Sequence, residues 1–230
     1  MGVAAGIGVY ANRHITVEEV KQHMADGAPD MQYHPDFSRA GIWNGFGRLG
    51  RVCRKLKQEL RLGPDDVVLD VGCNRGDLVA CLRPGCRRVV GIDVNERAVR
   101  SSDVDDLHVM SILDTDFPDD CFTRIVSSHT IEHIDDLGGA FAEMSRILRP
   151  GGLVVLHYPW EVFRGMATMR NAYRLFRDPF RGYELHRHRL CHGKIRSLIR
   201  GTRLHIVDRK FFWDPQPGYI TVLTKSVRDR

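Results

Sequence analysis

The chain has 230 residues, a formal net charge of +5 and 43% hydrophobic residues. This length suits one domain with a sizeable core, or one domain with a small cap. No apolar run approaches the ~20 residues of a membrane-spanning helix, and no basic segment precedes the apolar residues 2–11, so we expect neither a membrane span nor a signal peptide. The six cysteines lack a C-x-x-C pair, which favours free thiols in a reducing cytoplasm.

Positive charge gathers in the last third of the chain. Residues 161–230 carry 16 Lys or Arg against 6 Asp or Glu, whereas residues 1–160 are net acidic. Such asymmetry can mark an anionic partner, including an acidic small molecule or RNA. Because the chain has 28 Arg and only 6 Lys, an arginine-rich composition on solvated helices accounts for the excess equally well. The charge leaves an anionic substrate open without requiring one.

The first 62 residues have helical patterns. Residues 15–24 form an amphipathic pattern in which Thr16 and Glu19 match a capping box. Residues 43–62 place apolar side chains at helical spacing, and Gly63-Pro64 ends the pattern. The aromatic residues between these helices could cover a ligand or pack the second helix on the rest of the chain.

From residue 66 the pattern changes to short apolar strands alternating with helices, which is typical of parallel βαβ units. Such strands indicate a sheet that is buried on both faces. The last two strands are joined by a short connection with two prolines, which favours a final antiparallel hairpin. We predict strands at 67–71, 88–93, 107–111, 123–128, 153–158, 204–211 and 218–224, and helices at 76–82, 95–101, 136–148 and 193–201.

A long insertion separates the fifth predicted strand from the helix at 193–201. Residues 160–192 are rich in aromatic side chains and arginine, a composition that argues against disorder. Long insertions in compact domains are often functional lids. We therefore predict one or two helices over a substrate pocket.

The most informative stretch is residues 67–78, V-V-L-D-V-G-C-N-R-G-D-L. An apolar strand runs into a loop with two glycines, and a helical pattern follows, which places free backbone N–H groups beside a ligand. Gly72 and Gly76 would let the backbone approach that ligand closely. Asp70 lies at the carboxyl end of the strand, where open α/β sheets bind ligands.

This stretch resembles motif I of the class I S-adenosylmethionine-dependent methyltransferases, in particular the small-molecule type related to ubiquinone and menaquinone methyltransferases. Four more segments match that family in order: V-V-G-I-D-V (89–94), F-P-D-D-C-F (117–122), S-S-H-T-I-E-H (127–133) and R-I-L-R-P-G-G-L-V-V-L (146–156). The resemblance implies an α/β fold, a Rossmann-like doubly wound seven-stranded sheet that is parallel with an antiparallel last strand, in an α/β/α sandwich. It also implies a helical N-terminal lid (1–62) on a methyltransferase domain (63–230), with residues 160–192 as the substrate cap.

The resemblance further implies S-adenosylmethionine as cofactor and S-adenosylhomocysteine as product. Asp93 would accept the ribose hydroxyls, Val94 would pack on the adenine, and Asp70 would reach the amino-acid group or cap the glycine turn. Ser111 stands where the family has an acid near the adenine, and Asp114 is an alternative for that part. The full set of expected cofactor contacts is Asp70, Gly72, Cys73, Asn74, Gly76, Asp93, Val94, Ser111, Ile112, Ser128 and His129. Asn74 replaces a common glycine and tolerates a left-handed backbone.

The segment His129-Thr130-Ile131-Glu132-His133 has three interpretations. As H-x-x-E-H it matches an inverted zinc-protease motif, and a related methyltransferase branch binds a divalent ion at a similar sequence. A histidine here can also act as a general base. We expect no metal, with His129 as a wall of the methyl-donor site and His133 as the base. Tyr158 or His157, after strand five, could orient or deprotonate the acceptor, and strand alternation puts only one of them on the active face.

The predicted function is in-line transfer of a methyl group from S-adenosylmethionine to an O or N atom of a small molecule, in which the protein mainly positions the reactants. An anionic acceptor and a specialised biosynthetic pathway remain open. The alternatives are an RNA methyltransferase that uses the basic C-terminal third, and a cofactor-binding regulatory protein without catalysis. We expect a cytoplasmic monomer or homodimer with a small-molecule acceptor and no nucleic-acid partner.

Overall fold

A computed structural model describes residues 46–160, 169, 173, 177–178, 180, 188–214 and 216–227. The predicted helix at 15–24, most of the N-terminal lid and most of the substrate cap lie outside the described residues. Within the part that is described, no helix is long and apolar enough to cross a membrane.

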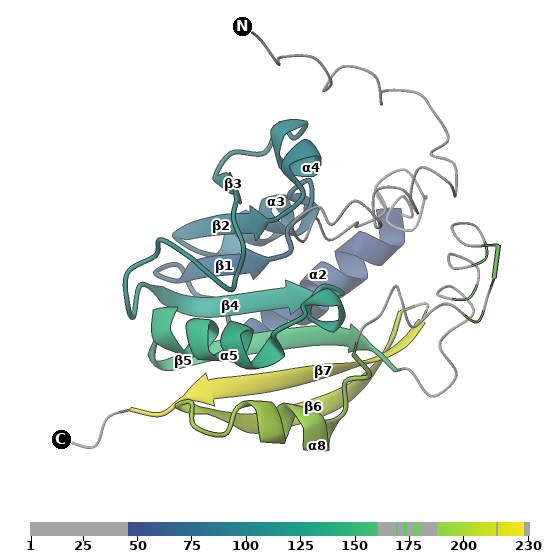
Figure 1. Cartoon of the computed structure of the whole chain (residues 1–230). Coiled ribbons are helices and arrows are strands. Elements are labelled where there is room, and N and C mark those ends of the chain that lie inside the picture. Colours follow the sequence, from purple (N-terminus) through teal and green to yellow (C-terminus); the bar gives the residue numbers. More distant parts are fainter. Residues whose placement is uncertain are drawn as a thin grey trace, which may run out of the picture.

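The core of the structure is a seven-stranded sheet in the order β3-β2-β1-β4-β5-β7-β6 (Figure 1). Strands β1 to β5 pair in parallel, whereas β7 is antiparallel to both β5 and β6. The predicted fold class and the final hairpin are confirmed. The strands are β1 (Val67–Val71), β2 (Arg88–Asp93), β3 (Leu107–Val109), β4 (Phe122–Ser128), β5 (Leu148–Pro159), β6 (Leu204–Asp214) and β7 (Gln216–Lys225).

The described helices follow the predicted ranges closely. They are α2 (Phe46–Leu60), α3 (Asp77–Leu82), α4 (Glu96–Arg100), α5 (Leu137–Ile147) and α8 (His192–Leu198), with 3₁₀ turns η1 (Arg83–Gly85) and η2 (Ile131–His133). Side-chain oxygens cap the N-termini of α4 and α5. Asn95 accepts a hydrogen bond from the Ala98 N–H, and Asp136 accepts one from the Gly139 N–H. These caps satisfy N–H groups that have no partner within the helix.

Several strands differ in length from the prediction, and β6 and β7 extend beyond the predicted 204–211 and 218–224. β3 ends at Val109 because the following residues turn, so that Ser111 makes an isolated bridge with Asp114. β5 begins at Leu148, five residues before the predicted start at 153, because Leu148 already pairs with Phe122 of β4. The prediction placed the start of β5 where its apolar run begins, at residue 153. Its backbone pairing with β4 begins earlier, before the arginine, proline and two glycines at 149–152.

Helices cover both faces of the sheet, as an α/β/α sandwich requires. On one face, Phe141 of α5 and Ile195 of α8 pack with Leu156 of β5. On the other, α2 and α3 pack on the sheet through a second buried cluster that includes Leu56 and Val155. Because side chains alternate along a strand, His157 faces the α2 side of the sheet and Tyr158 faces the α5 side.

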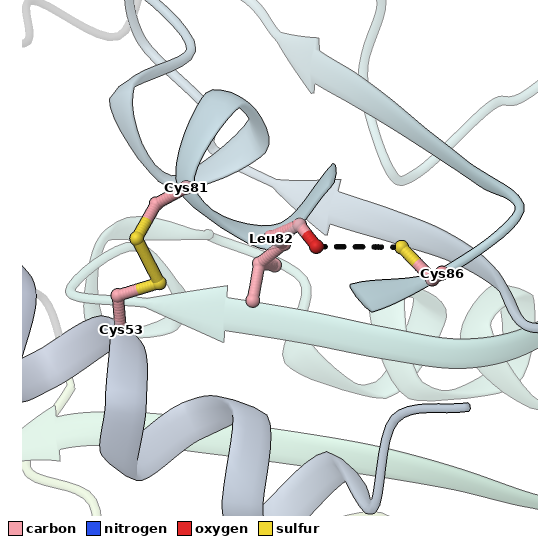
Figure 2. Close-up of a disulfide and its surroundings, with 4 residues drawn as sticks. All are labelled: Cys53, Cys81, Leu82 and Cys86. Atoms are coloured by element: carbon pink, nitrogen blue, oxygen red, sulfur yellow. Dashed lines mark hydrogen bonds between the residues drawn. A yellow bond between two sulfur atoms is a disulfide. The ribbon is translucent and has the colours of Figure 1, made fainter. Parts of the chain in front are cut away.

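The prediction of free thiols is wrong for two of the six cysteines. Cys53 of α2 and Cys81 of α3 form a disulfide with their Cα atoms 6.4 Å apart (Figure 2). The other four cysteines are free, and the Cys86 thiol donates to the Leu82 carbonyl at 3.5 Å. The pairing arises from the packing of two helices that lie 28 residues apart in sequence, which no local spacing reveals. The cysteines therefore no longer indicate a reducing compartment.

Candidate functional site

The predicted site residues meet at the carboxyl edge of the parallel strands. The loop after β1, the last residue of β2 and the first residues after β4 are hydrogen-bonded to one another or to neighbouring strand ends. Parallel strands end at the same edge of a sheet, and ligands of open α/β sheets bind there. The tertiary structure thus brings together loops that the sequence separates.

The loop after β1 is held by its own backbone. The N–H groups of Gly72 and Cys73 donate to the Ile92 carbonyl at 2.8 and 3.0 Å, and the Gly76 N–H donates to the Cys73 carbonyl at 2.8 Å. Gly72, Asn74 and Gly76 all have positive φ values, of 80°, 49° and 79°. The sequence prediction that Asn74 would accept a left-handed backbone is confirmed.

Both glycines are required by contacts within the protein. A Cβ atom at Gly72 would collide with the Thr130 side chain, and one at Gly76 would lie 2.9 Å from Leu107 Cδ1. We predicted that the glycines leave space for a ligand. The structure adds a reason within the protein, because their missing side chains make room for neighbouring residues. The N–H groups of Gly72, Cys73 and Gly76 already have carbonyl acceptors in the loop or in β2.

Asp93 connects two of the loops. Its Oδ2 atom accepts the Asn74 N–H and its Oδ1 atom accepts the Asn95 N–H, both at 2.8 Å. Each carboxylate oxygen can accept a second hydrogen bond, so Asp93 can hold the loops and still bind hydroxyl groups. Val94 beside it is 42% exposed, which leaves an apolar surface next to the carboxylate.

Asp70 is the most unusual group at this edge. Its side chain is buried, and its Oδ2 atom has no hydrogen-bond partner among the described residues. Burial, and secondly repulsion by Asp93, raise the pKa of this carboxyl to about 8. A buried polar atom without a partner is costly and is normally explained by a bound group. A cation or N–H donor would satisfy this oxygen and stabilise its charged form.

The Cys73 thiol is a poor nucleophile here. Burial raises the pKa of the Cys73 thiol, and the nearby charges of Asp70 and Asp93 raise it further. Only the thiolate is reactive, so Cys73 acts through its backbone and its volume.

We predict that Asp70→Asn removes a pH dependence of stability. An unfolded aspartate titrates near pH ~3.9, whereas the folded Asp70 carboxyl titrates at about 8. Between these values the folded state holds a proton that the unfolded state has lost, so the stability of the cofactor-free wild type falls relative to that of Asp70→Asn as the pH rises.

The measurement is the difference in denaturant midpoints between the two proteins at several pH values from 5 to 8. Replacing the exposed Asp65 with Asn is the control, and its difference from wild type should stay constant. The same constant difference for Asp70→Asn would contradict a raised pKa.

The ends of β4 and β5 hold a group of three polar side chains. His157 is 2% exposed, and its Nδ1 atom lies 3.0 Å from Ser128 Oγ. The His129 ring packs against the His157 ring with centroids 4.5 Å apart. The backbone N–H of His129 donates to the backbone carbonyl of His157 at 2.8 Å. His129 also has a positive φ of 54°, and its Nδ1 atom lies 3.6 Å from Glu132 Oε1. The loop thus presents the partly exposed His129 ring over the buried His157.

Tyr158 does not belong to this group, which corrects its prediction as a catalytic residue. Its side chain lies on the opposite face of the sheet and is fully buried, with its hydroxyl 2.9 Å from Thr221 Oγ1. Burial raises the pKa of the Tyr158 phenol. His157 is the β5 residue on the face of the sheet that carries the site. Strand alternation predicted that only one of His157 and Tyr158 would face the site, and the structure shows which one.

The remaining predicted residues lie at the margins of the site. Ser111 Oγ accepts the Leu113 N–H at 3.2 Å, Ile112 is buried, and Asp114 is the exposed bridge partner of Ser111. His133 is half-buried at the end of η2, where its backbone N–H donates to the Thr130 carbonyl. In the described part of the chain, no three His, Cys, Asp or Glu side chains are grouped to hold a metal ion.

Comparison with known proteins agrees with this geometry. Residues 69–156 match the family model described as a methyltransferase domain. A demethylmenaquinone methyltransferase of Symbiobacterium thermophilum is 28% identical over 127 residues, 49% of this chain and 48% of the relative. The 27-O-demethylrifamycin SV methyltransferase of Amycolatopsis mediterranei is 28% identical over 117 residues, 46% of this chain and 43% of the relative. The chain thus spans about half the length of these curated relatives.

Solved structures share the fold. A geranyl diphosphate methyltransferase in complex with S-adenosylmethionine superimposes with a TM-score of 0.59 at 17% identity, over 88% of this chain and 94% of that one. The N-methyltransferase NodS of Bradyrhizobium japonicum gives 0.57 at 20% identity, over 80% and 99%. Residues 69–156 thus resemble a methyltransferase domain, and the described part of the chain has the fold of these solved methyltransferases.

Proposed function

We propose that the chain binds S-adenosylmethionine and transfers its methyl group to an O or N atom of a small molecule. The observation that carries this proposal is the buried Asp70 oxygen without a partner among the described residues, beside the Asp93 carboxylate. S-adenosylmethionine carries a cationic amino group and a cationic sulfonium, and its ribose offers two hydroxyl donors. A buried carboxylate that lacks a cation and a carboxylate that can accept hydroxyls fit these groups.

Different residues at the carboxyl edge would contact different parts of the cofactor. The loop from Gly72 to Gly76 and Asp70 would hold the methionine end. Asp93 would accept the ribose hydroxyls, while Val94, Ile112 and Ser111 or Asp114 would line the adenine.

When bound, the cofactor supplies an already activated methyl group, so the protein's own task is to orient the acceptor and take up its proton. Ser128 and His129 would form the wall beside the acceptor, with the His129 ring held by its contact with His157. Histidine can accept a proton near neutral pH. We propose His129 or His133 as the general base, and we assign His157 to positioning because it is buried and bonded to Ser128.

The acceptor is proposed to be a small molecule in a biosynthetic pathway. The matched relative from Amycolatopsis mediterranei is named for methylation of rifamycin, which is a small molecule. The opposing possibility, an RNA acceptor, rests only on the net charge of the C-terminal third, and no contact among the described residues favours it.

Calorimetric titration of the whole chain with S-adenosylmethionine and S-adenosylhomocysteine tests this proposal. We expect micromolar dissociation constants for both, and at least tenfold weaker binding of adenosine, which lacks the amino-acid group that Asp70 would contact. If the folded chain binds neither compound, the proposed function is wrong.

A further inference from the structure

The β6–β7 hairpin carries an exposed group of aromatic side chains at the carboxyl edge of the sheet. Phe211 lies at its centre, with ring centroids 5.7 Å from Trp160, 6.3 Å from Trp213 and 5.6 Å from Tyr219. Trp160, Phe211 and Trp213 are 41%, 50% and 67% exposed. We call these four residues the aromatic surface. Exposed clusters of large apolar side chains often mark binding sites.

The aromatic surface lies on the opposite face of the sheet from the methyl-donor site. Tyr219 is paired in register with Tyr158 of β5 and with Phe211 of β6, and residues directly opposite on paired strands share a face. His157 and Phe212, which pack together with ring centroids 5.5 Å apart, belong to the other face. A ligand on the aromatic surface would therefore not occupy the space beside His157.

Arg209, which forms no ion pair with another described residue, lies next to this surface. The Arg209 guanidinium carbon is 3.6 Å from the centroid of the Tyr219 ring, and the buried Arg209 Nε has no hydrogen-bond partner in the described part of the chain. The nearest carboxylate in sequence, Asp208, is used elsewhere: its Oδ2 lies 2.9 Å from Lys210 Nζ and its Oδ1 accepts the Arg209 backbone N–H.

The other cations of this hairpin are compensated. Lys210 pairs with Glu59 of α2 at 2.7 Å as well as with Asp208. Arg209 instead hydrogen-bonds the Tyr158 phenol, and this bond and the charge of Arg209 partly oppose the burial that raises the pKa of that phenol. A partly buried cation that lacks an anion loses hydration without gaining a partner. Among the described residues, the charge of Arg209 therefore remains available to an anion.

We propose that Arg209 and the aromatic surface bind a small molecule with an anionic group on an aromatic body. A guanidinium can donate two parallel hydrogen bonds to a carboxylate or phosphate. The position of Arg209 over the Tyr219 ring holds its guanidinium beside the aromatic surface. The rings of Phe211, Trp160 and Trp213 offer edges and faces against which a flat apolar body can pack. This site goes beyond the proposed methyl transfer, because its residues lie on the opposite face of the sheet from His157.

The test uses 2-naphthoate as the probe, titrated into the whole chain by calorimetry. Neutral 2-naphthamide keeps the rings without the charge, and acetate keeps the charge without the rings. We expect 2-naphthoate to bind at least tenfold more tightly than either. Arg209→Met should weaken naphthoate binding at least tenfold, Arg209→Lys should weaken it less, and Arg200→Met, which alters an exposed arginine next to α8, should leave it unchanged.

Several results would overturn the proposal. These are naphthoate binding that is unchanged in Arg209→Met, equal binding of 2-naphthamide, or no binding of naphthoate to the folded wild type. If Arg209→Met fails to fold, the comparison of the three probes on wild type and on Arg209→Lys still decides. Asp93→Ala separates this site from the methyl-donor site, since that variant should keep naphthoate binding whether or not the chain binds S-adenosylmethionine.

Discussion

Asp93→Ala is expected to weaken S-adenosylmethionine binding by about a hundredfold, while the protein stays folded. The Asp93 carboxylate accepts N–H groups from both Asn74 and Asn95, so the substitution releases the loops after β1 and β2 from each other. Hydrogen bonds to a charged group contribute ~1.5–3 kcal/mol each, and the loss of the proposed ribose contact would add to this. Tenfold in affinity corresponds to ~1.4 kcal/mol, so two such losses account for the expected change.

The matched variants separate charge from shape. Asp93→Asn keeps one carbonyl oxygen that can accept an N–H, so it should bind the cofactor more weakly than wild type but more tightly than Asp93→Ala. Asp103→Ala removes an exposed carboxylate between α4 and β3 and should change nothing. Calorimetry measures the affinities, and circular dichroism confirms folding. Wild-type affinity in folded Asp93→Ala would exclude this residue from the cofactor site.

Reduction of the Cys53–Cys81 disulfide is expected to lower the free energy of unfolding by about 3–4 kcal/mol. The bridge closes a loop of 28 residues, and the entropy that such a crosslink removes from the unfolded chain corresponds to this range. The bridge joins α2 to α3, and α3 follows directly after Gly76 of the loop that we assign to the cofactor. Guanidinium unfolding with and without reductant measures the effect.

Cys81→Ser is the preferred variant because Cys81 is half-buried, whereas Cys53 is 1% exposed and belongs to the core under α2. Its stability should match that of the reduced wild type and should no longer respond to reductant. Cys121→Ser, which removes a half-buried free thiol, is the control and should keep the response. Thiol titration of the unfolded, unreduced chain should find four thiols, and a count of six would show that the bridge does not form.

The sequence predicted the architecture because the relevant signals are local. Apolar runs of five or six residues identified β1 and β2, and the glycines and acids after them identified the loops. Several strand boundaries differ, since β3 ends early at the Ser111 turn, β5 starts early at Leu148, and β6 and β7 extend towards their connecting turn. The start of β5 depends on backbone pairing with Phe122, which is distant in sequence, and apolar periodicity does not report such pairing.

The candidate site was predictable in its membership but only partly in its interactions. The ordered motifs placed Asp70, Asp93 and His129 at strand ends, and parallel strands necessarily bring those ends together. That Asp70 has a buried oxygen without a partner in the described region, and that Asp93 holds both neighbouring loops, depends on atoms contributed by several segments. The roles of these residues in binding and catalysis stay proposals that the titrations above test.

By itself, the sequence determined the order of strands and helices along the chain and the loops at the carboxyl edge, because these follow from short local patterns, and the order of the motifs gave the resemblance to a methyltransferase domain. Only the tertiary structure decided that His157 and not Tyr158 faces the site, that Thr130 and Leu107 are the reason for glycine at 72 and 76, and that Cys53 pairs with Cys81. It also placed Arg209 against the Tyr219 ring with a buried Nε that has no hydrogen-bond partner among the described residues. The physical reason is that packing between distant segments sets which face of a sheet a strand residue occupies and how a helix is rotated about its axis. A shift of one residue in strand register, or a quarter turn of a helix, changes which side chains meet.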